Sequence, residues 1–453
     1  MYPVSLTNLS CLAVLLIGYW LISARLRPLL LVLGGYILIE AYSPLLAAIF
    51  IGVTGCSWLG ATVLGRACTG RGLIAAGFVT AIAAGMIAAR WYFAAVAQAT
   101  QVRPPSWVAG PVMQVCAAMG VTIVCFHAIG YLLAVYRGRV RRSGWWSLAL
   151  YHGFFPLLSA GPMAEQADFQ RRFDHVQPPA PDEIGGALLR IARGLIKKLV
   201  LADTLGVFVG AVIASPGDFS GISCWCAAYV FAIQFYLGFS GLVDMAIGVA
   251  QLLGIRLPEN FDAPLLASNP SAFLQRWNIT LTEWLRTHVG VSTLSGGIVA
   301  FAIGAAWYGQ SLGVFLGGAL FAVAWWVWRK AQPTTAAILP NATARAIVGW
   351  GITFNVTALA LLLFRCGDWP TIASVLTRMF TLADGPIGGK RYVLIALLCL
   401  AMQAATRIPA FRPRWHRLHP AAVGSLLAVA VWVCILLSPD VHVGWISLAL
   451  TGS

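Results

Sequence analysis

Long apolar runs separated by short polar connections extend over almost the whole chain. Most of them approach or exceed the ~20 residues that an α-helix needs to cross the hydrocarbon core of a bilayer. The pattern predicts an all-α bundle of about eleven or twelve membrane helices in a single integral membrane domain, residues 1–453. The expected spans are 9–23, 28–41, 44–64, 72–95, 108–133, 145–161, 186–214, 222–254, 297–328, 343–365, 391–406 and 420–438.

The first of these runs has about the length of a signal peptide. However, Ser23-Ala24-Arg25 is a poor cleavage site, and another apolar run follows at once. We therefore expect Leu9 to Ser23 to remain as the first helix. A re-entrant or interfacial helix is the alternative for short runs such as 145–161.

One long segment departs from the apolar pattern. From Leu257 to Arg286, polar and aromatic residues alternate with apolar ones, and no window of 18 apolar residues remains. Phe273, Trp277 and Trp284 recur in it at roughly helical spacing, beside polar and charged neighbours. Polar groups at membrane depth are tolerated where they line a water-filled cavity or lie in the interface. Residues 257–286 are therefore expected to form a tunnel-lining or interfacial helix.

Composition supports a membrane protein. Hydrophobic residues make up 59% of the 453 positions and charged residues only 10%, against ~25% charged in soluble domains. The mean hydropathy is +0.81. The ten cysteines are scattered, mostly within apolar runs, and form no Cys-His cluster of metal-binding spacing. We expect neither a metal site nor a disulfide framework.

The net charge of +15 comes from 30 Lys and Arg against 15 Asp and Glu. The cations gather in short connections, which is the positive-inside pattern of cytoplasmic loops facing anionic lipid headgroups. No nucleic-acid recognition motif accompanies them. The expected partner of these basic residues is the lipid bilayer, and no nucleic acid is expected. The clusters are Arg137, Arg139, Arg141 and Arg142, then Arg171 and Arg172, then Arg407, Arg412, Arg414 and Arg417.

Five collinear stretches resemble a known family, the membrane-bound O-acyltransferases, in the bacterial branch of alginate O-acetyltransferase and teichoic acid D-alanyl transferase. They place a family core at about residues 114–380. The stretches are GVTIVCFHAIGYLLAVYRGRV from Gly120, FFPLLSAGPMAEQADFQRRF from Phe154, GLIKKLVLADT from Gly194, the segment from Tyr236 to Leu285 that includes GIRLPENFDAPLLASNPSAFLQRWNITLTEWL, and FRCGDWPTIASVLTRMF from Phe364.

The resemblance implies a helical bundle around a central tunnel that passes an acyl group from a cytoplasmic donor toward an acceptor hydroxyl at the outer face. It implies acetyl-CoA or a similar acyl thioester as donor, with no bound cofactor. It also implies a bacterial inner-membrane location, and a periplasmic acyl-handling protein or the polysaccharide synthesis and export machinery as partner. A polar segment inside a hydrophobic bundle is what such a tunnel needs.

Asp244 is the clearest acid within an apolar run, and an intramembrane carboxylate is a functional candidate by default. The alternative is a structural partner for a nearby Arg, Lys or backbone donor. Glu259 and Asn260 lie in a run that matches the family; Glu259 either caps the following helix or faces the tunnel. Lys197 and Lys198 either bind the donor or mark the cytoplasmic end of a helix.

Arg276 and Arg286 lie ten residues apart, so on an unbroken helix they share a broad face. Together they could hold anionic groups of the donor, or they could lie at the headgroup boundary with buried stems. Trp277 and Trp284 fall on one stripe, which fits a substrate wall, ordinary packing or an interfacial belt.

The sequence departs from the family at its histidines. The resemblance implies a Trp-His-Gly and, about a dozen residues later, a second His that is regarded as catalytic. Here the corresponding stretch is Trp307-Tyr308-Gly309, and Phe321 stands at the second position. The family's Arg-Trp-His is Arg276-Trp277-Asn278. Loss of general-base assistance usually costs about 10²- to 10⁴-fold in rate, so altered or reduced catalysis is expected.

Three other histidines lie near the motifs and are candidates to replace the missing base: His127, His152 and His288. For each, the simpler interpretation is a hydrogen-bonded core or interface residue. Asp244 and the hydroxyl of Tyr308 are further candidates for acid or base.

Two functional hypotheses follow. The first is an O-acyltransferase that acylates an exported polysaccharide or another cell-envelope polymer. The second is a catalytically inactive relative that serves as a scaffold or subunit of a polysaccharide-export assembly. A transporter also fits the hydropathy, but the internal repeats that it predicts are not visible in the sequence.

Overall fold

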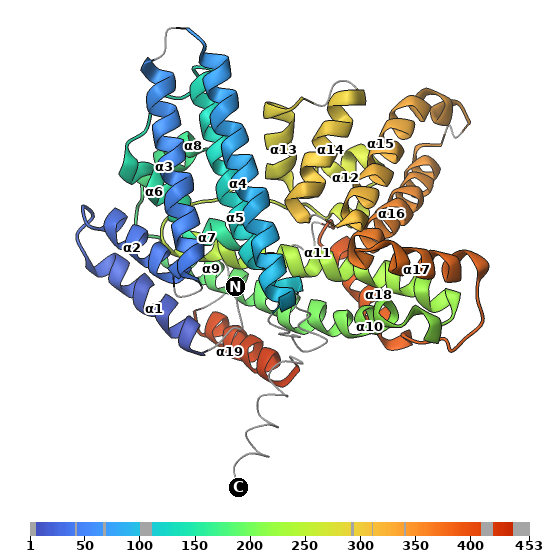
Figure 1. Cartoon of the computed structure of the whole chain (residues 1–453). Coiled ribbons are helices and arrows are strands. Elements are labelled where there is room, and N and C mark those ends of the chain that lie inside the picture. The colour runs from blue at the N-terminus through green and yellow to red at the C-terminus, as the bar shows by residue number, and fades with distance from the viewer. Residues whose placement is uncertain are drawn as a thin grey trace. The chain divides into compact units, whose positions relative to one another are not determined.

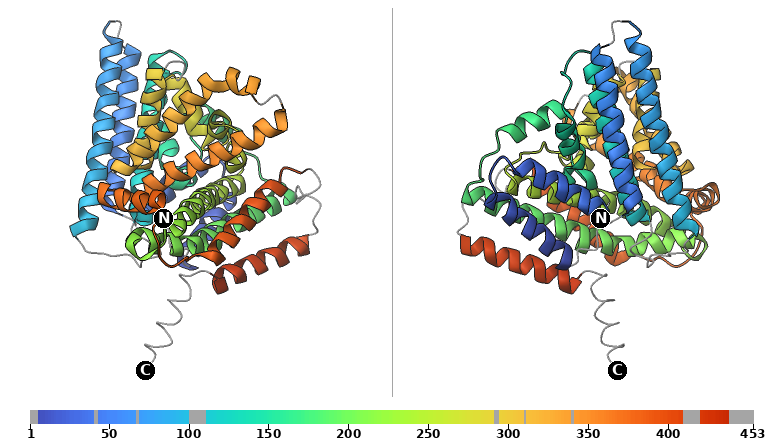
Figure 2. Two further views of the ribbon diagram at one scale, coloured as in Figure 1. Left: turned by 90° about the vertical axis from the view of Figure 1, so that its right-hand side faces the viewer. Right: turned by 60° about the vertical axis from the view of Figure 1, so that its left-hand side comes forward.

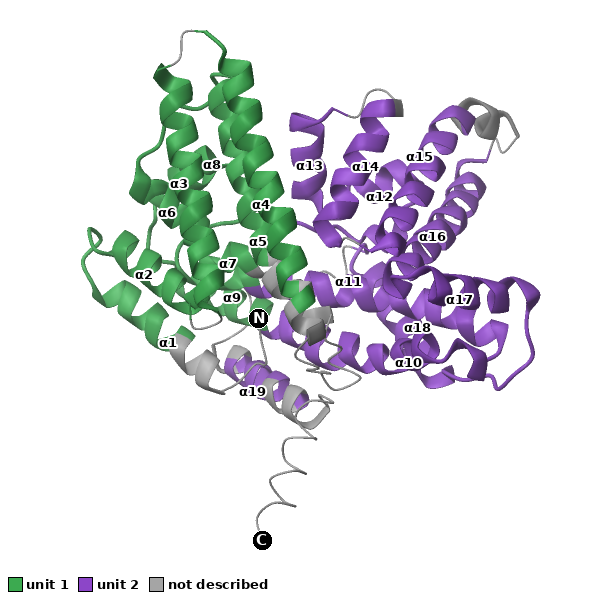
Figure 3. Cartoon of the chain, viewed as in Figure 1, with its two compact units in different colours: residues 1–103, 110–191, 246–258 green, residues 104–109, 192–245, 259–453 purple. Residues whose placement is uncertain are grey.

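The computed structural model describes residues 6–40, 43–66, 69–99, 111–290, 294–309, 311–338, 341–408 and 420–437. Within these ranges the regular elements are helices, apart from one isolated antiparallel bridge between Phe261 and Trp277. The predicted all-α class is therefore confirmed. The chain divides into two compact units (Figure 3). Unit 1 comprises residues 1–103, 110–191 and 246–258, and unit 2 comprises residues 104–109, 192–245 and 259–453.

Unit 1 is built on three long helices that lie side by side (Figures 1 and 2). They are α3, α4 and α5, and shorter helices pack on them. Its helices are α1 (Leu6–Leu21), α2 (Arg27–Glu40), α3 (Pro44–Arg66), α4 (Arg71–Ala99), α5 (Pro111–Tyr136), α6 (Trp145–Gly153), α7 (Phe155–Ala160), α8 (Gln166–Asp174) and most of α9 (Pro181–Leu195).

Unit 2 contains a row of neighbouring helices, α14, α15 and α16, which pack against one another in sequence order (Figure 1). Its elements are a π-helix η1 (Ile196–Ala202), α10 (Asp203–Ala214), η2 (Pro216–Asp218), most of α11 (Gly221–Leu252), η3 (Pro264–Leu266), α12 (Pro270–Leu274), α13 (Ile279–His288), α14 (Leu294–Tyr308), α15 (Leu312–Ile338), α16 (Ala342–Cys366), α17 (Trp369–Thr381), α18 (Lys390–Ala405) and α19 (Pro420–Leu437).

Within the described residues, five helices are long and apolar enough to cross a membrane, so the chain is a multi-pass membrane protein. Large apolar side chains on them, such as Val323 and Ile352, are about half exposed, as expected for lipid-facing positions. The total of eleven or twelve spans stays a prediction, because parts of the chain lie outside the described residues. The five candidate spans are Pro44–Arg66, Arg71–Phe93, Gly221–Leu252, Leu312–Ala331 and Ala342–Cys366; shorter apolar helices cover Leu12–Leu21, Gly120–Tyr136 and Ser295–Tyr308.

Two of the expected spans are not continuous helices. The run 297–328 forms two helices, because α14 ends at Tyr308 and α15 begins at Leu312. The run 145–161 also forms two helices, α6 and α7, which meet at Phe154. Pro156 lies in the first turn of α7 and has no N–H to continue the hydrogen-bond ladder of α6. Hydropathy averaged over a window hides such short breaks, so each pair of helices was predicted as a single span.

Asp368 caps the N-terminus of α17, because its carboxylate accepts a hydrogen bond from the backbone N–H of Thr371 at 2.9 Å. This bond holds the pKa of the Asp368 carboxyl below its ordinary value of 3.8. A lowered pKa means that the cap stabilises the fold above about pH 4 and that this stabilisation is lost as pH falls through the lowered value. We expect Asp368→Ala to lower the thermal midpoint by about 1–2 °C at pH 7 and by less at pH 3.

Asn341 provides a matched control without a charge. Its side-chain oxygen caps α16 by accepting bonds from the N–H groups of Thr343 and Ala344, at 2.9 and 3.1 Å. Asn341→Ala should lower the midpoint equally at both pH values. A pH-independent effect of Asp368→Ala, measured by the same thermal scan of the purified protein, would contradict a charged cap.

Candidate functional site

The polar segment of residues 257–286 folds back on itself instead of forming one helix. The N–H of Asp262 donates to the carbonyl of Arg276, and the N–H of Ile279 donates to the carbonyl of Asn260, both at 3.0 Å. Asn278 adopts a left-handed conformation with φ of 43°, which separates α12 from α13. The expected unbroken helix is therefore wrong, and Arg276 and Arg286 do not share a helix face.

A buried hydrogen-bond network is centred on the two asparagines of this segment. Asn260 donates from Nδ2 to Oδ1 of Asn278 at 2.9 Å, and its own Oδ1 accepts bonds from the backbone N–H and hydroxyl of Thr280. Asn278 in turn donates from Nδ2 to the hydroxyl of Tyr308 at 3.0 Å, and Trp277 donates from Nε1 to the same oxygen at 2.9 Å. Asn278 and Tyr308, at two of the positions where the family resemblance predicts a histidine, are therefore in direct contact.

Aromatic rings surround this network. The ring of Trp277 stacks on those of Phe235 and Phe273, with centroids 5.7 and 5.4 Å apart. Phe364 meets the ring of Tyr308 edge-on at 6.0 Å. Because these rings exclude water, the polar contacts to Tyr308 lie in surroundings of low polarity, which strengthens them.

Next to the network is a cavity of about 400 Å³, within the range of small-molecule sites. Its walls come from α12 to α16, all in unit 2, and include Trp277, Asn278, Tyr308 and Phe321. Most of the other lining side chains are apolar or glycine. Among the described residues that line it, the groups able to carry charge are Arg286, Arg329 and the phenol of Tyr308; no imidazole or carboxylate belongs to this set.

Outside the cavity lining lie three other residues of the polar segment that the sequence singled out: Glu259, Arg276 and Trp284. Glu259 is exposed, and Arg276 is half-buried. Trp284 packs its ring against that of His288, with centroids 4.8 Å apart. Arg286 does line the cavity and also forms an ion pair with Glu283, whose oxygen lies 2.7 Å from Nη2. The cavity therefore gathers Trp277, Asn278, Arg286, Tyr308 and Phe321, and the structure does not bring His288 to its wall.

His127 and His152 lie in unit 1 and are both buried. The ring of His127 stacks on Tyr151 at 4.6 Å. His152 bonds through Nδ1 to the hydroxyl oxygen of Thr54 at 3.1 Å. The hydroxyl of Thr54 also bonds the carbonyl oxygen of Phe50 at 2.8 Å. This arrangement is that of packed core histidines.

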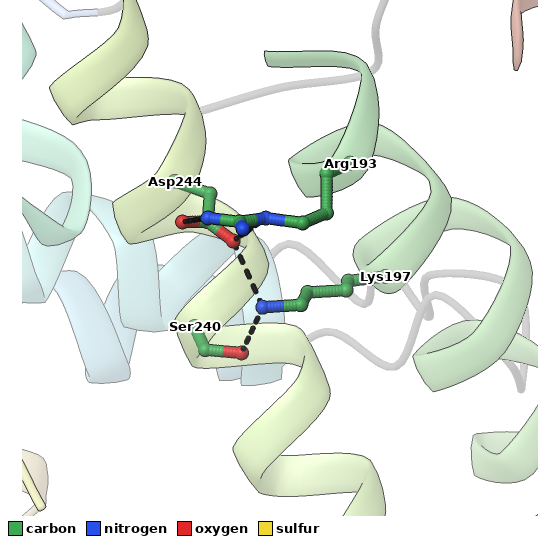
Figure 4. A network of polar contacts seen from close by, with 4 residues as sticks. All are labelled: Arg193, Lys197, Ser240 and Asp244. Atoms are coloured by element: carbon green, nitrogen blue, oxygen red, sulfur yellow. Dashed lines mark hydrogen bonds and ion pairs between the residues drawn. The ribbon is translucent and has the colours of Figure 1, made fainter. Parts of the chain in front are cut away.

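Asp244 lies on α11 between two cations (Figure 4). Its carboxylate accepts two bonds from Arg193, at 2.6 and 3.0 Å, and one from Nζ of Lys197 at 2.8 Å. Lys197 also donates to the hydroxyl of Ser240 at 3.4 Å. Lys198 pairs separately with Asp203. Asp244 thus has the environment expected of a structural partner for basic residues.

Two glycines let these helices approach. A Cβ added at Gly194 would lie 2.5 Å from the carbonyl oxygen of Gly241, and one added at Gly241 would lie 2.7 Å from the carbonyl oxygen of Gly194. The backbones of α9 and α11 are therefore in direct contact at this crossing. The π-helical turn that follows carries Lys197 and Lys198, and such turns are frequent at functional sites.

Sequence reasoning named Asp244 and Lys197 separately and did not connect them. A usable signal was present, because Arg193 and Lys197 are four residues apart and hence on one face of a helix. Arg329 was missed as a cavity residue. Nothing in its local sequence distinguishes it from other residues of an apolar helix, since the cavity forms only when distant helices pack together.

A family model described as MBOAT, membrane-bound O-acyltransferase family, matches residues 106–360. A probable alginate O-acetylase of Pseudomonas fluorescens is 28% identical over 384 residues, covering 81% of this chain and 72% of that protein. A peptidoglycan O-acetyltransferase of Helicobacter pylori is 31% identical over 244 residues, covering 51% of this chain and 46% of that protein. A teichoic acid D-alanyltransferase of Streptococcus thermophilus is 23% identical over 282 residues, covering 54% of this chain and 68% of that protein.

The extent of these matches differs between relatives. The match to the Pseudomonas fluorescens protein covers almost three quarters of that protein. For alginate O-acetylases of three other Pseudomonas species and of Azotobacter vinelandii, and for the Helicobacter protein, the chain spans about half of the relative's length.

Proposed function

Because this chain belongs to the membrane-bound O-acyltransferase family, we propose that it transfers an acyl group to a hydroxyl of an exported polysaccharide or another cell-envelope polymer. The names of its relatives support this class of acceptor, since they describe acetylation of alginate and of peptidoglycan and D-alanylation of teichoic acid. The proposed location is the bacterial inner membrane. The proposed donor is an acyl thioester such as acetyl-CoA, and the proposed partner is a periplasmic acyl-handling protein or the polysaccharide synthesis and export machinery.

The observation that carries the proposal is the hydroxyl of Tyr308 at the cavity wall. Its oxygen accepts hydrogen bonds from both Trp277 and Asn278. A phenol can accept two bonds and donate one, so its own proton is available to a ligand in the cavity. The two bonds also fix the position of the oxygen. Tyr308 is therefore suited to donate to the carbonyl oxygen of an acyl group.

The reaction balances as a simple acyl exchange. The acceptor hydroxyl attacks the carbonyl carbon, a C–O bond forms, the C–S bond of the thioester breaks, and the hydroxyl proton ends on the thiol. Negative charge develops on the carbonyl oxygen in the transition state, where a positioned donor such as Tyr308 stabilises it. With an ordinary pKa of about 10, a phenol is better suited to donate at pH 7 than to act as a base.

A scaffold without turnover is the second candidate. The observation that favours it is the cavity lining, in which the described residues supply no imidazole or carboxylate to accept the proton of the acceptor hydroxyl. On this interpretation Asn278, Tyr308 and Phe321 stabilise the fold where relatives carry out chemistry.

A transfer assay separates the two candidates. The purified full chain is incubated with labelled acetyl-CoA and, separately, with alginate, peptidoglycan and teichoic acid. We expect slow transfer by the unmodified protein and a further fall of about 10²-fold in Tyr308→Phe, which removes one donor to the oxyanion. Tyr229→Phe is the matched control, because its hydroxyl bonds Asn355 and does not line the cavity. No transfer to any acceptor would end the enzymatic proposal.

The same assay tests the substitute bases. His127→Ala, His152→Ala and His288→Ala are measured beside the unmodified protein, with folding checked by size-exclusion chromatography. Selective loss of transfer in one folded variant would identify that histidine as the base. Unchanged transfer in all three would show that none of these histidines is the base.

A further inference from the structure

We propose that the ends of α3, α4 and α5 form a binding site for an anionic phospholipid whose head group carries two phosphates. The site is built from six arginines in two connections of unit 1, and we call them the arginine cluster. Its ligand is a lipid, so the proposal is independent of acyl transfer and holds for an active enzyme and for a scaffold alike. The arginine cluster comprises Arg66, Arg71, Arg137, Arg139, Arg141 and Arg142.

The packing of the three long helices brings the two connections together. Helix α3 ends at Arg66, α4 begins at Arg71 and α5 ends at Tyr136, and the three helices lie side by side (Figures 1 and 2). Nη2 of Arg71 donates to the carbonyl oxygen of Tyr136 at 3.5 Å, which joins the start of α4 to the end of α5. Arginines that are far apart in the sequence therefore lie at one end of this group of helices.

Acids of the same part of the chain do not neutralise the arginine cluster. The sequence from residue 41 to residue 164 contains eight arginines and no Asp or Glu. Arg139, Arg141 and Arg142 are exposed, and none of them forms an ion pair within the described residues. Like charges that lie close together repel one another, so an anionic group that lies among them is stabilised.

The other two basic segments of the sequence differ from the arginine cluster. Residues 165–183 carry five acids against two arginines, and Arg171 pairs with Asp168. In the third segment, Arg407 is the arginine that the structure describes, and it pairs with Asp262 at 2.9 Å. The positive-inside pattern treats the three segments alike, whereas ion pairing among the described residues distinguishes the arginine cluster from the others.

Aromatic residues indicate that the arginine cluster lies at the level of the lipid phosphates. Trp58 precedes Arg66 by eight residues on α3, which is about 12 Å along the helix axis. Its ring meets that of Trp145 edge-on at 6.2 Å, and the neighbouring Trp146 is 66% exposed. Trp is enriched where the hydrocarbon core meets the head groups. Arginines beyond these rings along α3 are therefore well placed to contact phosphate.

Both connections are open to a head group. Gly70 and Gly138 have positive φ angles of 69° and 71°, and a Cβ added at either would meet no atom within 4 Å. Guanidinium groups bind phosphate through two parallel hydrogen bonds, which an ammonium group cannot form. One phosphate would lie beside Arg66 and Arg71, and the other beside the arginines that precede α6. A head group with two phosphates fits this division.

Native mass spectrometry tests the proposal. The purified full chain in detergent micelles is mixed with cardiolipin, which carries two phosphates, or with phosphatidylglycerol or phosphatidylcholine of the same acyl chains, and bound lipid is counted. We expect cardiolipin to bind about tenfold more tightly than phosphatidylglycerol, with phosphatidylcholine weakest, and its binding to weaken as salt is raised. Equal binding of all three lipids would overturn the proposal, and equal binding of the two anionic lipids would overturn its two-phosphate part.

Paired charge variants locate the site. Arg139→Gln combined with Arg141→Gln should weaken cardiolipin binding at least tenfold, because each surface arginine strengthens the attraction to anionic lipid by about fivefold. Arg171→Gln combined with Arg172→Gln removes the same charge, also at exposed positions, and should change binding by less than twofold. Equal weakening by both pairs would mean that net charge alone attracts the lipid, and it would overturn the site.

Two further measurements complete the test. Size-exclusion chromatography checks folding, and Arg66→Gln combined with Arg142→Gln serves if the first pair fails to fold, with the same tenfold expectation. Pyrophosphate in about hundredfold excess distinguishes a lipid from a soluble diphosphate as the ligand. Bound cardiolipin should remain unchanged, because a lipid is also held by its acyl chains. Displacement by pyrophosphate would assign the arginine cluster to a soluble ligand and overturn the lipid proposal.

Discussion

Gly194→Ala is expected to lower the free energy of unfolding by about 3 kcal/mol, because the added methyl group has no room. Its Cβ would lie 2.5 Å from the carbonyl oxygen of Gly241 and 3.0 Å from the backbone nitrogen of Met245. Neither backbone atom can move away unless the helices separate. Separation of α9 from α11 would also lengthen the bonds from Arg193 and Lys197 to Asp244. The measurement is SDS-induced unfolding of the full chain in mixed micelles.

Gly186→Ala on the same helix is the matched control. No atom lies within 4 Å of a Cβ at this position, and alanine is favoured over glycine within a helix by up to about 1 kcal/mol. The control should therefore be neutral or stabilising. If both substitutions changed stability equally, the contact between the two backbones would not matter, and the crossing at Gly194 and Gly241 would have to be revised.

The long helices could be predicted from the sequence because a bilayer demands a simple local signal, an apolar run of sufficient length. Helices α3 and α16 lie within a few residues of the ranges expected from hydropathy. The breaks could not be predicted in the same way. A turn between Tyr308 and Leu312, or at Phe154, occupies a few residues and hardly changes the average hydropathy over a window.

The polar segment shows the same limit at the candidate site. Its composition marked residues 257–286 as unusual, and Trp277 and Asn278 do line the cavity. Its conformation depends on pairing between residues near 261 and residues near 277, and on a left-handed Asn278. Those features arise from contacts between positions about sixteen residues apart, whereas helical periodicity is a property of neighbours. Periodicity therefore suggested one helix where the chain turns back.

The ion-pair partners of Asp244 could not be predicted from the sequence. A carboxylate in an apolar helix needs partners, but the sequence offers many cations that could serve. The choice of Arg193 and Lys197 depends on the close approach of α9 and α11 at two glycines. In the sequence those glycines are indistinguishable from glycines such as Gly186, which has open space around it.

Asp244→Ala is expected to lower the free energy of unfolding by about 3 kcal/mol. Removing the carboxylate of a buried ion pair typically costs 3–5 kcal/mol. The lower figure applies because the side chain of Arg193 is 48% exposed, so water screens its interaction with the Asp244 carboxylate. The side chain of Lys197 is only 21% exposed and is screened less. Asp218→Ala, at an exposed acid of the same unit, should change stability by less than about 0.5 kcal/mol.

A double-mutant cycle separates the ion pair from simple loss of packing. Lys197→Met should cost less than Asp244→Ala, because Arg193 still bonds the carboxylate through two nitrogens. In the absence of Asp244, Lys197 has lost the carboxylate with which it pairs, so Lys197→Met then removes only an uncompensated cation. The double variant should therefore be more stable than the sum of the single effects predicts, by about 1 kcal/mol or more. Strict additivity in SDS unfolding would mean that charge does not hold α11 to the π-helical turn.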